Sequence, residues 1–288
     1  MASRSYQYEQ CFVTVVDGVT PTIILEADTI PAAWEASIQA LWKHGARRPT
    51  QYDKPDDPPG RAAVAVMHIN DPLSEPRIHK AYPGGIGKLV EYTDEVVDGI
   101  HDHWVDMHDP KKWHYTYHGR FAGWSAAGLE INQIETTLDL LVKAPHTRRA
   151  QMTTWNPAID PFDDHCPCLQ RLWFTVGPDD KLQMHAHIRS NDAFKAAFMN
   201  IYAFTEFQAM MARRLSERLG RKIEVGLYKH FADDYHIYGA YFDEVSKFFE
   251  KVDTRPFAER TWRTADVQPV IDEARGYINR GVALPPYL

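Results

Sequence analysis

The second half of the chain constrains the fold most, because it predicts a hairpin, a long helix and a further strand in succession. Residues 171–188 read as two strands joined by the Gly-Pro-Asp-Asp turn at 177–180. Residues 192–219 carry apolar side chains at helical spacing and stop at Gly220, and residues 222–231 predict another strand. The length of 288 residues is within the range that a single α/β or α+β enzyme occupies.

The rest of the chain predicts elements of both kinds. Strands are expected in a hairpin over 11–27 and at 61–69 and 150–155, and helices at 31–44, 86–107 and 128–143. No internal repeat or low-complexity tract interrupts them. We therefore expect residues 1–288 to form a single domain.

Composition excludes several classes of function. The chain has 288 residues, of which 44% are hydrophobic and 25% charged, as in a soluble globular protein. It has neither a long apolar run nor a signal pattern, which predicts a cytoplasmic protein away from membranes. A net charge of -7 argues against a general nucleic-acid binder. The 14 histidines show no convincing ligand spacing, so no metal is expected.

Three cysteines are too few for a disulfide framework, and Cys166 and Cys168 flank Pro167. A free cysteine is usually a small buried residue, but arginines lie on both sides of this pair in the sequence. Guanidinium groups match phosphate oxygens and also lower the pKa of a nearby thiol. We therefore expect one ligand to be anchored through phosphate and attacked by Cys168.

Five motifs, in this order along the chain, resemble the thymidylate synthase family. They are Thr147-Arg148-Arg149, Trp155-Asn156-Pro157, Pro167-Cys168, Arg189-Ser190-x-Asp192-x-Phe194 followed by Asn200, and His236-x-Tyr238. The resemblance covers roughly residues 115–245. That family modifies C5 of pyrimidine nucleotides with 5,10-methylenetetrahydrofolate.

The resemblance implies an α+β (three-layer α/β) fold, with a mixed β-sheet packed by helices and one sheet face forming a homodimer interface. It also implies shared sites, in which Arg148 and Arg149 reach the phosphate bound by the partner subunit. The expected ligand is a pyrimidine nucleoside monophosphate, and the expected cofactor is methylenetetrahydrofolate.

The same resemblance implies roles for individual side chains. Cys168 is the nucleophile, and the ligand contacts are Arg189 and Ser190 to phosphate, Asn200 to the base, His236 and Tyr238 to the sugar, and Asp192 to the folate. Tyr117 (or Tyr115) is placed beside the nucleophile because Tyr117-x-Gly119-Arg120 resembles a degraded form of the family's Tyr-Gly segment. Two further assignments depend on order in the chain rather than on a motif: Glu75 as the acid/base group and Arg48 at the phosphate.

Leu169 departs from the family, which usually has histidine directly after the nucleophile. We expect this leucine to make the pocket drier, and it favours a divergent member, such as those acting in antibiotic pathways or on phage nucleotides. Methylation of UMP or dUMP is the first hypothesis. The alternatives are a CMP or dCMP hydroxymethylase, and a non-catalytic nucleotide-binding homodimer with a regulatory role.

Asn200 bears on the choice of base. Its amide offers one donor and one acceptor, complementary to uracil O4 and N3–H, whereas a cytosine-modifying relative is expected to carry aspartate there. A flipped amide presents the opposite pattern, and the sequence does not show what fixes its orientation.

Overall fold

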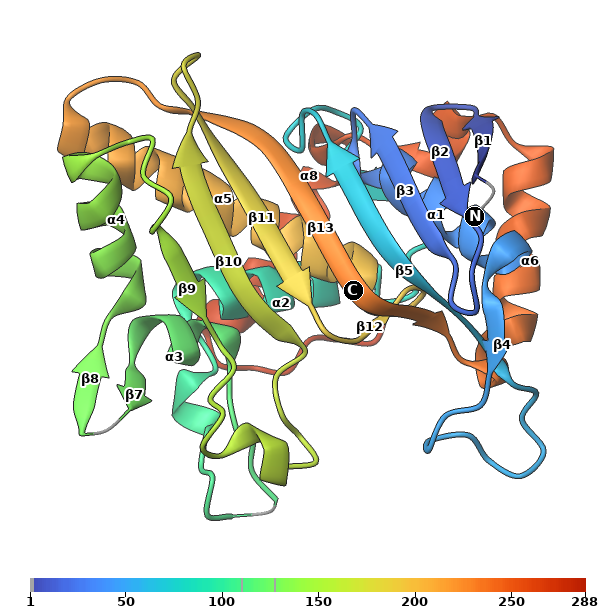
Figure 1. Ribbon diagram of the computed structural model, residues 1–288, viewed down its shortest axis with the longest axis horizontal. Coiled ribbons are helices and arrows are strands. Elements are labelled where there is room, and N and C mark those ends of the chain that lie inside the picture. Colours follow the sequence, from blue (N-terminus) through green and yellow to red (C-terminus); the bar gives the residue numbers. More distant parts are fainter. Residues whose placement is uncertain (1–2, 110, 127) are drawn as a thin grey trace.

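The computed structural model describes residues 3–109, 111–126 and 128–288. A ten-stranded sheet runs through it in the order β1-β2-β3-β5-β13-β11-β10-β9, with β4 paired to β5 and β12 paired to β13. Figure 1 shows the long helices gathered behind one face of this sheet, while the face toward the viewer carries no helix. The architecture is therefore α+β, as predicted.

The sheet is mixed. β3–β5 and β11–β13 are parallel pairs, whereas β5–β13 and the hairpin β10–β11 are antiparallel. The strands are β1 (Ser3–Tyr8), β2 (Cys11–Val16), β3 (Thr22–Ala27), β4 (Ala46–Arg48), β5 (Gly60–Ile69), β9 (Gln151–Thr153), β10 (Leu169–Val176), β11 (Lys181–Ile188), β12 (Asn191–Asp192) and β13 (Glu224–Ile237). Two small sheets pair β6 (Ile78–His79) with β14 (Thr261–Trp262), and β7 (Trp124–Ala126) with β8 (Leu129–Ile131).

The helices differ in how much of their surface they bury. α5 contributes a wide apolar face to the core, and α1 is buried along most of its length, with Trp34 fully enclosed and its Nε1 donating to the Ala193 carbonyl at 2.8 Å. The helices are α1 (Ile30–His44), α2 (Gly85–Asp98), α3 (Tyr117–Ala122), α4 (Gln133–Lys143), α5 (Ala197–Leu219), α6 (Phe242–Thr254), α7 (Phe257–Arg260) and α8 (Thr264–Asn279). Within the described ranges, none of them has the length and apolarity needed to cross a bilayer.

Most predicted elements are present, but three helices start or stop elsewhere. α2 ends at Asp98 rather than 107, because Gly99 adopts a left-handed φ of 68° and closes the helix. α4 begins at Gln133 rather than 128, because Asn132 caps it and the preceding residues form β8. The helix expected from 192 begins at Ala197, since β12 takes its first residues.

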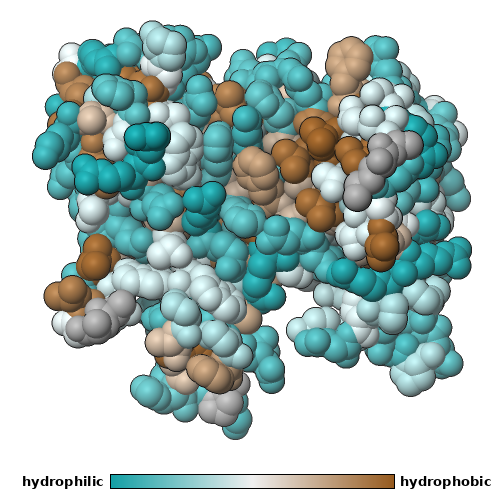
Figure 2. Space-filling model, viewed as in Figure 1, coloured by the Kyte–Doolittle hydropathy of each residue, from teal (hydrophilic) through white to brown (hydrophobic). Residues whose placement is uncertain are grey.

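The open sheet face is partly apolar (Figure 2). Phe12 and Ile24 are 66% and 43% exposed on β2 and β3, and a groove of about 380 Å³ crosses the neighbouring strands. Val64, Val66, Trp173 and Phe231 contribute side chains to that groove. Alternation places these residues outward because their neighbours point into the helical layer.

Candidate functional site

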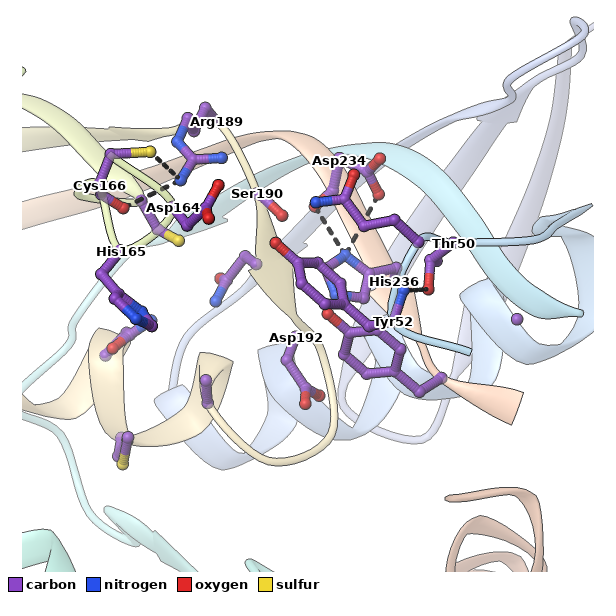
Figure 3. Close-up of a pocket in the computed structure, with 18 of the residues that line it drawn as sticks. Thr50, Tyr52, Asp164, His165, Cys166, Arg189, Ser190, Asp192, Asp234 and His236 are labelled. Atoms are coloured by element: carbon purple, nitrogen blue, oxygen red, sulfur yellow. Dashed lines mark hydrogen bonds and ion pairs between the residues drawn. The ribbon is translucent and has the colours of Figure 1, made fainter. Parts of the chain in front are cut away.

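A cleft of about 1050 Å³ lies beside the end of β13, between the loop before β10, the start of α5, and the segment joining β4 to β5. Nine of the twelve predicted site residues line it: Arg48, Tyr117, Cys168, Arg189, Ser190, Asp192, Asn200, His236 and Tyr238. Figure 3 shows Arg189 and Cys166 on one side of this space and Tyr52 and His236 on the other. The fold therefore gathers residues that are up to 190 positions apart in the chain.

Arg189 holds the loop that carries Cys168. Its Nε donates to the Pro167 carbonyl, and its Nη2 donates to the carbonyl and Sγ of Cys166, all at 3.0 Å. Burial raises the pKa of Cys168, and the Arg189 charge offsets this only in part. The expectation of a lowered thiol pKa is therefore wrong for the nucleotide-free protein, because loss of hydration outweighs the arginine.

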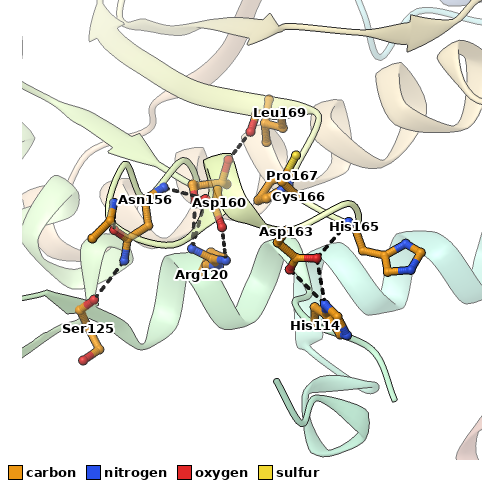
Figure 4. A network of polar contacts seen from close by, with 12 residues as sticks. His114, Arg120, Ser125, Asn156, Asp160, Asp163, His165, Cys166, Pro167 and Leu169 are labelled. Atoms are coloured by element: carbon orange, nitrogen blue, oxygen red, sulfur yellow. Dashed lines mark hydrogen bonds and ion pairs between the residues drawn. The ribbon is translucent and has the colours of Figure 1, made fainter. Parts of the chain in front are cut away.

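Hydrogen bonds made by residues just before Cys168 hold the loop of Cys168 in place (Figure 4). The Asp163 carboxylate accepts hydrogen bonds from His114 Nδ1 at 2.8 and 2.9 Å and from the His165 amide at 2.9 Å. Hydrogen bonds from these partners lower the pKa of Asp163 despite its desolvation. Leu169 is fully buried in the core and does not line the cleft, so it does not make the pocket drier as expected.

Tyr117 fixes the backbone directly after Cys168. Its hydroxyl accepts a hydrogen bond from the Leu169 amide at 3.2 Å, and burial raises the pKa of Tyr117 well above its ordinary value. Tyr115 also lines the cleft, with its ring centroid 5.6 Å from that of Tyr117. Burial raises the pKa of Tyr115 as well, so both tyrosines stay protonated at neutral pH, and both line the cleft together with Cys168.

Asp192 and His236 form the opposite wall. Asp192 Oδ1 accepts from the amides of Phe194 and Lys195 at 3.0 and 2.9 Å, and burial is the main cause that raises its pKa. Burial likewise lowers the pKa of His236, which keeps the imidazole neutral. Its Nε2 is buried without a hydrogen-bond partner among the described residues, so it is available to a ligand.

Arg48 and Tyr238 complete this wall. Arg48 forms an ion pair with Asp234, the residue whose carboxylate also contacts His236 Nδ1 at 3.2 Å. The ring of Tyr238 packs edge-on against His236 with a centroid distance of 4.7 Å. The predicted sugar-binding pair is thus side by side, and Arg48 lies at its rim.

Comparison with known proteins identifies the family. The family model described as thymidylate synthase matches residues 90–273, more than half of the chain. The chain belongs to the thymidylate synthase family.

Relatives and a solved structure agree with this assignment. Proteins described as "putative thymidylate synthase" from Methanocaldococcus jannaschii and Methanosarcina acetivorans are 27% and 25% identical over 235 and 214 residues. These matches cover 79% and 73% of this chain, and 96% and 89% of the relatives. The thermostable thymidylate synthase A from Bacillus subtilis shares the fold with a TM-score of 0.55 at 18% identity, over 77% of this chain and 84% of that one.

Family membership carries general properties. Thymidylate synthases catalyse a C5 methyl-transfer type of reaction with methylenetetrahydrofolate, bind nucleotides of the dUMP type, and commonly form homodimers. The chain is accordingly a methyltransferase-type enzyme of nucleotide metabolism, with a mixed sheet packed by helices.

Three predicted residues do not line the cleft of this thymidylate synthase fold. The Glu75 carboxylate accepts from the amides of Arg77 at 3.0 Å and Thr264 at 3.1 Å, which caps the first turn of α8. Arg148 and Arg149 are exposed in the loop between α4 and β9. Trp173, on the open sheet face, donates from Nε1 to the Arg148 carbonyl at 3.1 Å.

Sequence reasoning missed Glu95, which lines the cleft and is only 9% exposed. Its carboxylate accepts from His101 Nδ1 at 3.0 Å, and burial raises its pKa. A signal for it exists in the sequence, because Glu95 stands between Tyr92 and Val96 on the apolar face predicted for α2. A carboxyl group on such a face needs a hydrogen-bond partner or a function.

Proposed function

We propose that this protein transfers a one-carbon unit from methylenetetrahydrofolate to C5 of UMP or dUMP through covalent catalysis by Cys168. The observation that carries the proposal is that one cleft holds the thiol, the guanidinium of Arg189 and the amide of Asn200. A nucleophile, a phosphate ligand and a base-reading group are the three elements that this chemistry requires.

The Cys168 thiolate adds to C6 of the pyrimidine, so an S–C6 bond forms and the ring electrons move to C5 and O4. This addition makes C5 nucleophilic. Arg189 holds the loop of Cys168 through the Pro167 carbonyl and the carbonyl and Sγ of Cys166. Its Nη1 has no hydrogen-bond partner among the described residues and can donate to phosphate. Binding through phosphate places the ring at the thiol, where effective concentration accelerates the attack.

Methylenetetrahydrofolate, when bound, supplies the one-carbon unit. The cleft of about 1050 Å³ is at the upper end for a single small-ligand site, so it has room for a nucleotide and a second ligand. Asp192 uses Oδ1 for backbone amides and leaves its other carboxylate oxygen for the amino-pyrimidine edge of a pterin.

Removal of the C5 proton needs a carboxylate in the cleft, and Glu95 takes this role in our proposal in place of Glu75. Burial raises the pKa of Glu95 above its ordinary value, which suits a group that accepts and returns a proton. Glu75 instead accepts a hydrogen bond from the Thr264 amide in the first turn of α8. The bond between the transferred carbon and the folate nitrogen would then break, and that carbon would take up either hydride from the tetrahydrofolate, which gives methyl, or water, which gives hydroxymethyl. Departure of the thiolate from C6 restores the aromatic ring and the free Cys168.

The second subunit completes the phosphate site in this proposal. Arg148 and Arg149 are exposed beside the open sheet face, whose apolar groove is suited to burial against a second copy. Pairing of two such faces about a two-fold axis carries the arginine loop of each subunit to the other.

Release of tritium from C5-labelled nucleotide tests the proposal. With methylenetetrahydrofolate, UMP or dUMP is expected to release tritium, Cys168→Ser to abolish release, and Cys166→Ser to retain it. No release from UMP, dUMP, CMP or dCMP would leave only a nucleotide-binding role. The mass of the product distinguishes a methyl from a hydroxymethyl group.

A further inference from the structure

Asn200 has a single side-chain partner among the described residues, and that partner is Tyr92. The Tyr92 hydroxyl lies 2.7 Å from Asn200 Oδ1, in a contact that joins α2 to the first turn of α5. Both residues line the cleft, and Asn200 is only 6% exposed.

The Tyr92 hydroxyl fixes the orientation of the Asn200 side-chain amide. Tyr92 is partly buried at the wall of the cleft, and this burial raises its pKa well above its ordinary value, so the group remains an O–H at neutral pH. An O–H at this partly buried position is less stable without an acceptor, and Asn200 Oδ1 is its only acceptor among the residues that the structure describes. A flipped amide would turn its NH₂ toward the hydroxyl and leave that O–H without an acceptor.

We propose that Tyr92 is a specificity-determining residue, which selects uracil over cytosine by locking the Asn200 amide in one orientation. The proposal depends on the function proposed above. Uracil presents an acceptor at O4 beside a donor at N3, and cytosine presents a donor at N4 beside an acceptor at N3, so the two bases require opposite amide orientations. Tyr92 removes one of those orientations.

Tyr92→Phe tests the lock, since it removes one oxygen and keeps the ring. The readout is the ratio of kcat/KM for the uracil nucleotide to kcat/KM for the matching cytosine nucleotide, measured by tritium release. We expect this ratio to fall about tenfold, the effect of losing one partly buried hydrogen bond. Thermal unfolding near the wild-type midpoint shows that the variant is folded.

Tyr82→Phe is the matched control. Tyr82 is buried and its hydroxyl donates to Met199 Sδ at 3.1 Å, but it does not line the cleft. Tyr82→Phe also removes one hydroxyl oxygen, from a residue just before α2, and the ratio of kcat/KM for the two bases is expected to stay at the wild-type value. An equal fall in both variants would show a general packing effect and would overturn the proposal.

Asn200→Asp provides a second test, because a carboxylate has two equivalent oxygens and no orientation to lock. In this background Tyr92→Phe is expected to leave the base ratio unchanged, so the effects of the two substitutions are not additive. Calorimetric titration with UMP and CMP gives the same comparison without turnover. An unchanged ratio in Tyr92→Phe itself refutes the lock, whereas wild-type protein that binds neither nucleotide refutes the proposed function instead.

Discussion

At the scale of single residues, the reactivity of Cys168 is set by a balance between burial and one arginine. Burial favours the neutral thiol and Arg189 favours the thiolate, with burial the larger effect. Cys168 is therefore mostly protonated at neutral pH in the free protein.

Alkylation kinetics check this balance. In a Cys11→Ser/Cys166→Ser protein, the rate of Cys168 alkylation by iodoacetamide is expected to rise with pH through a midpoint above the ordinary cysteine pKa of about 8.5. The rise follows the thiolate fraction, since the thiolate is the attacking form. A midpoint below 7 would mean that Arg189 outweighs burial.

Glu95 and Glu75 form a matched pair for testing the proton-transfer role. Glu95→Gln is expected to slow tritium release by about 10²- to 10⁴-fold, the usual contribution of a general acid/base, while UMP affinity changes little. Glu75→Gln weakens the cap on α8 and is expected to cost about 1 kcal/mol of stability with near-normal release. The reverse pattern would restore Glu75 as the catalytic carboxylate.

At the scale of elements, periodicity and turn residues predicted the strands around the 177–180 turn and helix α1 closely. The same signals extended α2 beyond Asp98, because the apolar residues Ile100 and Trp104 continue the helical spacing after Gly99. A glycine in that register is compatible with a helix interior or with a cap, and only its φ of 68° distinguishes them.

Gly99→Ala therefore tests the end of α2. An added Cβ would lie 2.2 Å from His118 Nδ1 and would hold a strained positive φ. Gly220→Ala has a similar φ of 64° but open space around the new methyl group. We expect Gly220→Ala to lower the free energy of unfolding by about 1–2 kcal/mol, the cost of a left-handed residue, and Gly99→Ala to lower it further. Equal losses would show that the His118 contact relaxes freely.

At the scale of the whole molecule, the site consists of residues from distant segments. The family motifs predicted seven of its lining residues, including Cys168 and Asn200, and weaker signals predicted Tyr117 and Arg48. Glu95 and Tyr92 were missed because their roles come from contacts between α2 and the rest of the cleft, which local spacing does not reveal. Sheet order is equally non-local, since β13 lies between β5 and β11.

Subunit sharing predicts complementation. Cys168→Ser and Arg148→Ala/Arg149→Ala proteins are each expected to be nearly inactive, for different reasons. After mixing and subunit exchange, half of the dimers are mixed, and each contains one site with both defects and one with neither, so about a quarter of all sites regain activity. If the mixture is no more active than the two variant proteins measured separately, Arg148 and Arg149 do not contribute to the site of the partner subunit.

The central claim is that the Cys168 sulfur bonds to C6 of a pyrimidine nucleotide, and a C5-fluorinated nucleotide tests it most directly. Fluorine at C5 cannot leave as a cation, so the S–C6 bond cannot be discharged after the one-carbon unit is added. With 5-fluoro-UMP or 5-fluoro-dUMP and methylenetetrahydrofolate, peptide mass spectrometry is expected to find the adduct on Cys168 in wild-type and Cys166→Ser proteins. An adduct on Cys166, or a full-yield adduct in Cys168→Ser protein, would contradict the account.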